Sequence, residues 1–110
     1  MNPDHILVLQ MRGHVDILID YVAQCDNYDD YKANEPVCSA SVLHLLQIGE
    51  LANGLSEDFR NHNKDIPWKS IVGLRNIIAH HYGDLNYKRI WEIMFTEIPR
   101  FSYWLKEIFI

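Results

Sequence analysis

The chain has 110 residues, a hydrophobic share of 48% and a formal net charge of −5. This length predicts one domain, residues 1–110, with a single core and no separate cofactor domain. No apolar run approaches the ~20 residues of a membrane-spanning helix, and the N-terminus lacks the pattern of a signal peptide. We therefore expect a cytoplasmic protein with no membrane partner, in which Cys25 and Cys38 act as small hydrophobic residues.

The charges are distributed unevenly along the sequence. Residues 1–58 hold only Arg12 and Lys32 against ten acidic residues, a balance of −8, whereas residues 59–110 hold eight basic and five acidic residues, a balance of +3. An acidic chain is a poor general ligand for nucleic acid, because Lys and Arg provide the nonspecific affinity for phosphate. The basic excess of the second half makes that half the better candidate for phosphate contacts.

Apolar residues recur with helical spacing along almost the whole chain, which predicts an all-α fold. The first helix is expected over residues 3–23, with Pro3 in its opening turn. A polar, acidic stretch over residues 26–31, either a loop or a frayed helical end, should follow it. The second helix is expected from Asn34, which can cap it, to about Arg60. A polar connection over residues 61–65 ends this half of the bundle.

The third helix should begin at Pro67 and run to Tyr82, directly before Gly83. The fourth helix should begin after Asn86, and Pro99 should kink it or interrupt one hydrogen bond. These elements predict an antiparallel bundle of four, or up to five, helices. The aromatic stripe of the last helix is consistent with core packing and equally with a subunit interface.

The end of the third helix carries side chains suited to phosphate chemistry. Arg75 offers a permanently charged fork that matches phosphate oxygens, and the imidazole of His80 can accept and release a proton near neutral pH. Metal-free RNA cleavage needs a base for the 2′-OH, a cation beside the phosphorus centre and an acid for the leaving 5′-oxygen. Arg75 and His80 fit these roles, Asn76 can support the imidazole or a phosphate oxygen, and the 2′-OH requirement predicts RNA as the substrate.

The helical geometry raises a difficulty for this site. At ~100° per residue, Arg75 and His80 point ~140° apart around an ideal helix. Three arrangements would bring the two groups together: the helix loosens before Gly83, the Arg side chain wraps round, or two copies of the motif meet. In the third arrangement the arginine of one subunit faces the histidine of the other, and dimerisation is part of the mechanism.

Structural roles are also open for these residues. Arg75 can be an ion-pair partner of Glu50 or Asp84, and Glu50 is equally a candidate for orienting Arg75 in a site. The histidine pattern predicts no metal site, because the adjacent His80 and His81 point in different directions and the others are scattered: His5, His14, His44 and His62. No cofactor is expected.

The run of residues 66–76, followed by His80 and Tyr82, resembles the HepT-like (DUF86) proteins of the HEPN superfamily. Residues 47–52 upstream and Trp91 and Pro99 downstream extend the resemblance over nearly the whole chain. It implies an all-helical homodimer that acts as a metal-independent ribonuclease, the toxin of a toxin–antitoxin pair. Its cognate antitoxin would be a minimal nucleotidyltransferase that attaches AMP to Tyr82 (AMPylation). Ile77 stands where many relatives carry a second basic residue, which puts RNA affinity and substrate range in question.

Two rival hypotheses remain. A non-catalytic helical module would use Arg75 to bind a nucleotide or a nucleotidyltransferase subunit. The acidic net charge and Ile77 favour this module, whereas the triplet of Arg75, His80 and Tyr82 favours the enzyme. A purely structural dimerisation domain would leave the polar cluster unexplained.

Overall fold

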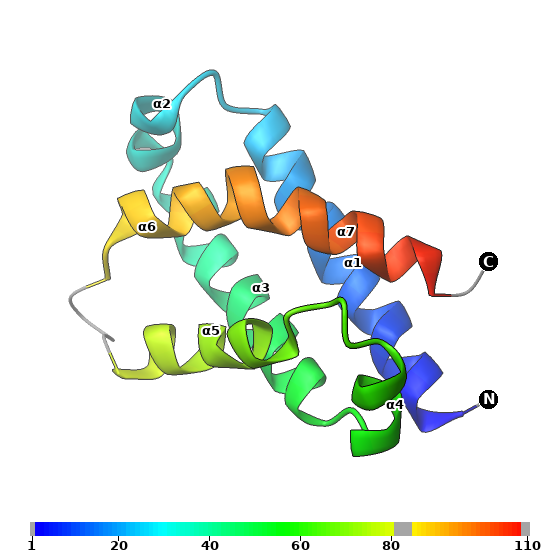
Figure 1. Cartoon of the computed structure of the whole chain (residues 1–110). Coiled ribbons are helices and arrows are strands. Elements are labelled where there is room, and N and C mark those ends of the chain that lie inside the picture. The colour runs from blue at the N-terminus through cyan, green and yellow to red at the C-terminus, as the bar shows by residue number, and fades with distance from the viewer. Residues whose placement is uncertain (1, 81–84, 109–110) are drawn as a thin grey trace.

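The computed structural model describes residues 2–80 and 85–108, and within these ranges the chain is helical and contains no strand (Figure 1). The predicted all-α bundle is therefore confirmed. In chain order the elements are α1 (Pro3–Ala23), α2 (Tyr28–Ala33), α3 (Glu35–Asn53), α4 (Glu57–His62), α5 (Trp68–His80), α6 (Tyr87–Glu92), the π-helical turn η1 (Ile93–Glu97) and α7 (Ile98–Glu107).

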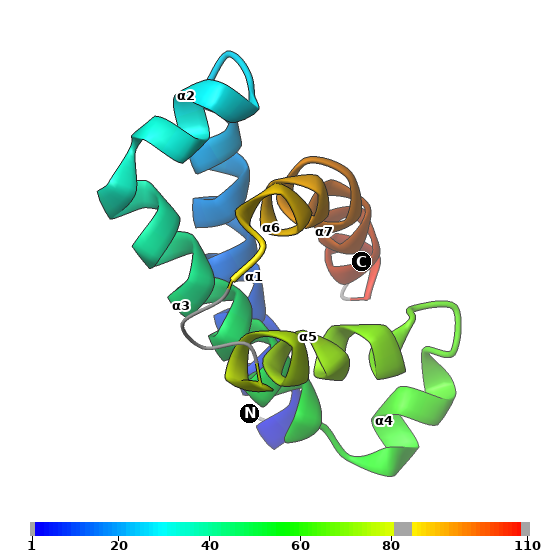
Figure 2. The same ribbon diagram turned by 90° about the vertical axis from the view of Figure 1, so that its left-hand side faces the viewer.

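The helix α3 connects the two halves of the bundle, because it packs against α1 and against α5. The segments α6, η1 and α7 form one continuous helical path that crosses α1, and Figures 1 and 2 show this path from two directions. Burial of each large apolar side chain contributes about 1.5–3 kcal/mol. The fully buried side chains come from α1, α2, α3 and the last helical path, among them Met11, Leu18, Tyr31, Leu45, Ile48, Met94, Phe101 and Leu105.

The prediction of a loop or a frayed helical end over residues 26–31 is wrong, since most of this stretch belongs to α2, a separate helix with its own cap. Asn27 caps this short helix by accepting a hydrogen bond from the backbone N–H of Asp30 at 2.9 Å. Tyr31 anchors the helix in the core, where its ring is fully buried. The polar pattern of these residues gave no sign that Tyr31 is buried. The cap at Asn27 starts the short helix that places Tyr31 in the core.

Buried polar groups around Tyr31 are paired with one another. The Tyr31 hydroxyl and Ser41 Oγ are 2.7 Å apart, Ser41 Oγ donates to the carbonyl of Cys38, and Cys38 Sγ donates to the carbonyl of Tyr31. Burial raises the pKa of the Tyr31 phenol and the pKa of the Cys38 thiol. Cys38 is therefore a buried small residue as predicted, whereas Cys25 is only partly buried.

The second long helix ends earlier than predicted, at Asn53 instead of Arg60. The chain turns at Gly54, and α4 starts directly after its cap residue Ser56. The Oγ atom of Ser56 accepts a hydrogen bond from the backbone N–H of Phe59 at 3.1 Å. The Asp4 carboxylate accepts hydrogen bonds from the backbone N–H and the hydroxyl of Ser56 at 2.8 and 2.7 Å. These bonds lower the pKa of Asp4 and join the start of α1 to the start of α4.

Pro99 lies in the first turn of α7, directly after the π-helical turn η1. The predicted interruption therefore takes the form of a wider turn, after which proline, lacking an N–H, fits at a new helix start. Within the aromatic stripe of this path, Phe101 is buried in the core, while Phe95 and Tyr103 are 61% and 65% exposed. No helix in the described part of the chain is both long and apolar enough to cross a membrane.

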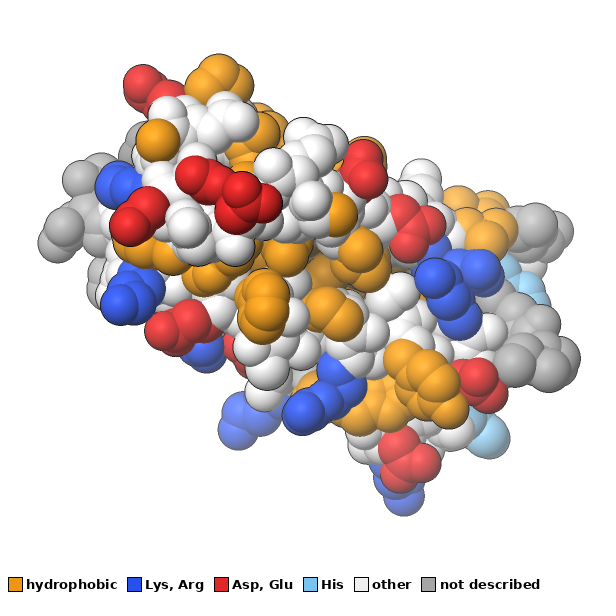
Figure 3. Space-filling model, turned by 90° about the horizontal axis from the view of Figure 1, so that it is seen from above, with side chains coloured by type: hydrophobic (Ala, Val, Ile, Leu, Met, Phe, Trp, Pro, Cys, Tyr) orange, Lys and Arg blue, Asp and Glu red, His pale blue; other side chains and the backbone are white. Residues whose placement is uncertain are grey.

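Figure 3 shows the surface seen from above. Hydrophobic side chains form a band across the middle of this face, and acidic side chains predominate along its upper side in the view. Lys and Arg side chains are more frequent along the lower side, where acidic side chains also lie. The hydrophobic band on this face is therefore bordered by both signs of charge.

Candidate functional site

Arg75 lies on α5 beside α3, and its guanidinium contacts Glu50. The Nη1 atom of Arg75 is 3.5 Å from Oε1 of Glu50, and the two side chains are 32% and 51% exposed. An ion pair with this much solvent contact contributes only about 0–1 kcal/mol to stability. Its main effect is to orient the guanidinium while leaving part of it accessible, which suits both roles considered for Glu50.

Gly49 allows α5 to approach α3 at the point where Arg75 lies. A Cβ atom on Gly49 would stand 3.0 Å from the backbone N and 3.2 Å from the Cβ of Arg75, and 3.3 Å from the carbonyl O of Ile71. These distances are too short for ordinary packing, and two of the three neighbouring atoms belong to the backbone. The absence of a side chain at Gly49 therefore fixes the distance between Arg75 and Glu50. Sequence analysis assigned no role to Gly49, although an isolated glycine within an apolar helix is a known sign of close packing.

The remaining motif residues follow along α5. Asn76 is exposed, and Ile77 is 38% exposed, so the position without a second basic residue does face solvent. His80 is the last residue of α5. Its side chain lies outside what the structure describes, as do the whole residues Tyr82 and Asp84, the second ion-pair partner considered for Arg75.

The course of α5 excludes one of the three arrangements that would bring Arg75 and His80 together. The element is α-helical from Trp68 to His80, so no loosened turn separates Arg75 from His80. Regular α-helical geometry places the two Cα–Cβ directions ~140° apart. Arg75 faces α3, where its guanidinium contacts Glu50. Either the Arg side chain reaches round the helix, or a second copy completes the site.

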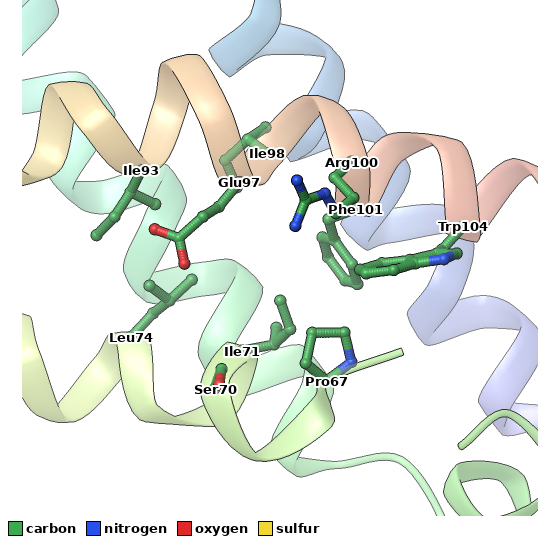
Figure 4. Close-up of a pocket in the computed structure, with 10 residues that line it drawn as sticks. All are labelled: Pro67, Ser70, Ile71, Leu74, Ile93, Glu97, Ile98, Arg100, Phe101 and Trp104. Atoms are coloured by element: carbon green, nitrogen blue, oxygen red, sulfur yellow. The ribbon is translucent and has the colours of Figure 1, made fainter. Parts of the chain in front are cut away.

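A cavity of about 110 Å³ lies on another side of α5, between this helix and the η1–α7 path. Figure 4 shows side chains from both elements pointing toward one another across it, with the Glu97 carboxylate and the Arg100 guanidinium beside apolar side chains. On the α5 side the cavity is lined by Ser70, Ile71 and Leu74 of the helix and by Pro67, which directly precedes it. None of Arg75, Asn76 or Glu50 lines this cavity, which is therefore separate from the motif.

The tertiary structure brings together two histidines that appeared scattered in the sequence. The Nδ1 atoms of His14 on α1 and His44 on α3 are 2.8 Å apart, and the ring of Tyr21 meets His44 edge-on with centroids 5.9 Å apart. Burial lowers the pKa of both imidazoles, and the His14 charge lowers the pKa of His44 further. The lowered pKa values favour the neutral form of both rings, in which the Nδ1–H of one ring can donate to the Nδ1 of the other. Within residues 2–80 and 85–108 no group of three or more His, Cys, Asp or Glu is placed to hold a metal ion.

Comparison with known proteins identifies the family. The family model described as ribonuclease HepT-like matches residues 11–108. A protein of Caldanaerobacter subterraneus subsp. tengcongensis named "Putative RNase TTE0752" is 35% identical over 82 residues, which cover 74% of this chain and 73% of the relative. A protein of Methanocaldococcus jannaschii named "Putative RNase MJ1380" is 32% identical over 83 residues, 76% of this chain and 75% of the relative.

A more distant relative is the "Probable ribonuclease HepT" of Thermococcus cleftensis, 24% identical over 72 residues, which cover 66% of each chain. No solved structure matches the chain significantly. The match of the family model spans α3 and α5, which hold Glu50 and Arg75, and the whole of the last helical path. The chain belongs to the ribonuclease HepT-like family.

Proposed function

We propose that this protein is a metal-independent ribonuclease whose site is formed by Arg75 and His80. The observation that carries the proposal is the position of Arg75, half-exposed and oriented by Glu50 on a helix that runs unbroken to His80. The family match supports the same activity, since three relatives carry ribonuclease names. A merely structural arginine would not require a guanidinium that stays partly accessible to solvent.

The reaction follows from the chemistry of these groups. A neutral imidazole of His80 takes the proton of the ribose 2′-OH, the 2′-oxygen attacks phosphorus, and the bond to the 5′-oxygen breaks as that oxygen receives a proton. Arg75 stabilises the charge that develops on the phosphate oxygens. Asn76 supports the imidazole or a phosphate oxygen, and Glu50 is a positioning residue because it acts through Arg75. The products are a 2′,3′-cyclic phosphate and a 5′-hydroxyl.

A homodimer accounts for the two proton transfers. One α5 helix directs Arg75 and His80 to different sides, whereas two helices that meet can place the arginine of one subunit opposite the histidine of the other. Two such helices also provide two imidazoles, one as base and one as acid. We therefore propose that the active form is a symmetric dimer with the site in the shared groove.

The nuclease proposal is tested by incubating the purified protein with total RNA in excess chelator. The parent should degrade RNA, Arg75→Ala and His80→Ala should each lose about 100-fold or more in rate, and Glu50→Gln should lose less. Arg100→Ala removes an exposed arginine from α7 and should behave like the parent. Degradation that persists in both motif variants would reveal a contaminating nuclease and contradict the assignment.

We further propose that the protein is a toxin neutralised by a cognate minimal nucleotidyltransferase that transfers AMP to Tyr82. Co-expression with such an enzyme encoded nearby should add one AMP mass per chain in intact-protein mass spectrometry. Tyr82→Phe should remove the label, whereas Tyr103→Phe should keep it, because Tyr103 is highly exposed but lies at the far end of the last helical path. Equal labelling of the Tyr82→Phe variant would disprove the modification site.

The second candidate function is a non-catalytic module that binds a nucleotide or the nucleotidyltransferase through Arg75. Two observations favour it: the net charge of −5, and the exposed Ile77 at a position where a second cation would help to hold RNA. The same RNA assay separates the two functions. A parent protein that leaves RNA intact but loses nucleotide binding in Arg75→Ala would establish the module.

A further inference from the structure

The helices α2 and α6 pack against each other at one end of the molecule (Figures 1 and 2). A group of aromatic rings and lysines lies at this contact. Lys32 of α2 places its ammonium 4.5 Å from the ring centroid of Tyr87 on α6, and Lys88 of α6 stands 5.9 Å from the ring centroid of Tyr28 on α2. These reciprocal cation–π contacts hold the two helices together. We call the four residues, together with the nearby Phe95, the aromatic–lysine surface.

Phe95 is the feature that packing does not explain. Its ring is 61% exposed, although the ring lies only 5.9 Å from that of Trp91, with an interplanar angle of 30°. Trp91 in turn stacks within 5.3 Å of the buried Tyr31. The exposed ring is thus supported from behind by two further aromatic rings that reach into the core. A rigid ring with a free face is the form of side chain on which a planar group stacks.

We propose that the aromatic–lysine surface binds single-stranded RNA, with a base stacked on Phe95 and phosphates beside Lys32 and Lys88. The inference rests on the proposed ribonuclease function and names where its substrate is held. Single-strand binding surfaces combine exposed aromatic rings with cations that follow the backbone. Both lysines are exposed and are positioned by their ring contacts, so they offer fixed positive charge to phosphate.

The surface also lies close to the motif along the chain. The motif helix α5 ends at His80, and α6 begins at Tyr87. The six residues between them can span at most about 25 Å, even when fully extended. A short RNA strand held on the surface can therefore reach the motif of the same subunit. The lysines also offset Asp29, Asp30 and Glu92 on the same two helices, so we expect modest, salt-sensitive affinity.

The test measures binding of a fluorescent 2′-O-methyl oligonucleotide, which cannot be cleaved because its 2′-OH is blocked. Phe95→Ala should weaken binding by roughly 5-fold to 100-fold, the range found for loss of one stacked base. The pair Lys32→Gln and Lys88→Gln should weaken it too, and should reduce the slope of log K against log salt by about 0.7 per lysine. A purely structural role would leave that slope unchanged.

The matched control removes an aromatic ring and a lysine elsewhere. Tyr103→Ala with Lys106→Gln takes the same groups from the exposed side of α7 and should leave binding at the parent value. Circular dichroism of each variant checks that the helices persist, and the conservative Phe95→Tyr should restore most of the binding. Binding that survives both surface changes, or that is lost equally in the control, overturns the proposal.

These experiments distinguish a failure of the RNA-binding proposal from a failure of the ribonuclease proposal. If the parent degrades RNA and the surface variants have unchanged kcat and KM, the ribonuclease proposal is supported and RNA binding at the aromatic–lysine surface is refuted. A parent that binds the oligonucleotide through this surface but degrades no RNA refutes the enzyme alone. Loss of co-purification with the nucleotidyltransferase in the surface variants, with RNA binding unchanged, would assign the surface to a protein partner and refute our proposal.

Discussion

Gly49 is the residue on which the placement of Arg75 depends. Replacement by Ala would put a methyl group 3.0 Å from the backbone N of Arg75, so α5 would have to move away from α3. We expect Gly49→Ala to lower the free energy of unfolding by about 1–2 kcal/mol, because overpacking outweighs the gain in helix propensity. The rate of RNA cleavage should fall by more than the loss of folded protein explains, because the distance between Arg75 and Glu50 increases.

The chain provides a matched comparison for this prediction. An added Cβ at Gly13 or at Gly73 would meet no atom within 4 Å. Gly13→Ala and Gly73→Ala should therefore stabilise the protein by up to about 1 kcal/mol through helix propensity alone. Chemical denaturation of the three variants measures the difference. If Gly49→Ala is as stable and as active as Gly73→Ala, the close approach of α3 and α5 does not position the site.

At the scale of the elements, the His14–His44 pair makes the packing of α1 on α3 sensitive to pH. The folded state holds both imidazoles with lowered pKa values, so the unfolded chain, with an ordinary value near 6.5, binds protons more readily in acid. Stability contributed by the neutral pair is complete above pH ~6.5 and is lost as the pH falls below it. Thermal unfolding between pH 7.5 and pH 5 should show this decrease.

Asparagine replacements test the origin of the effect. The double change His14→Asn and His44→Asn keeps hydrogen-bonding groups at both positions but removes their titration, so the decrease between pH 7.5 and pH 5 should become smaller. His62→Asn is the control, because His62 is an exposed residue whose Nδ1 contacts the carbonyl of Asp58. An equal flattening by the control would show that the pair is not the source of the pH dependence.

For the whole molecule, the dimer predicts complementation between inactive variants. Arg75→Ala and His80→Ala subunits that exchange form a mixed dimer in which one groove retains both an arginine and a histidine. If the arginine and the histidine of a site come from different subunits, an equal mixture should recover measurable cleavage. About one quarter of the parent rate is the upper bound, because half of the dimers are mixed and half of their sites keep the arginine–histidine pair, and the missing second imidazole lowers the rate of those sites further. If both residues act within one chain, mixing restores nothing.

The oligomeric state is the control for this experiment. Analytical ultracentrifugation of each variant should show the dimer before mixing, since neither change removes apolar surface. The exposed apolar side chains on α1 and α3 include Ile6, Leu9, Ile17 and Leu43. A protein that stays monomeric at assay concentrations while degrading RNA would contradict the shared groove.

Long helices were predictable because their burial repeats with the period of the helix. The stretch of residues 3–23 matches α1 at both ends, since Asn2 caps it and Pro3 fits its first turn. The short helices α2 and α4 were not predicted, because six residues carry too few apolar positions to show a period. Caps at Asn27 and Ser56, together with the hydrogen bonds that Ser56 donates to Asp4, define them instead.

The sequence by itself determined the helical class, the family and the residue types of the motif, because periodicity and local spacing are properties of consecutive residues. The tertiary structure decided which side chains meet: Arg75 with Glu50 across Gly49, His14 with His44, and the lysines of α2 and α6 with each other's tyrosines. These contacts join residues on different helices. The crossing of packed helices, and not their order in the chain, sets such distances.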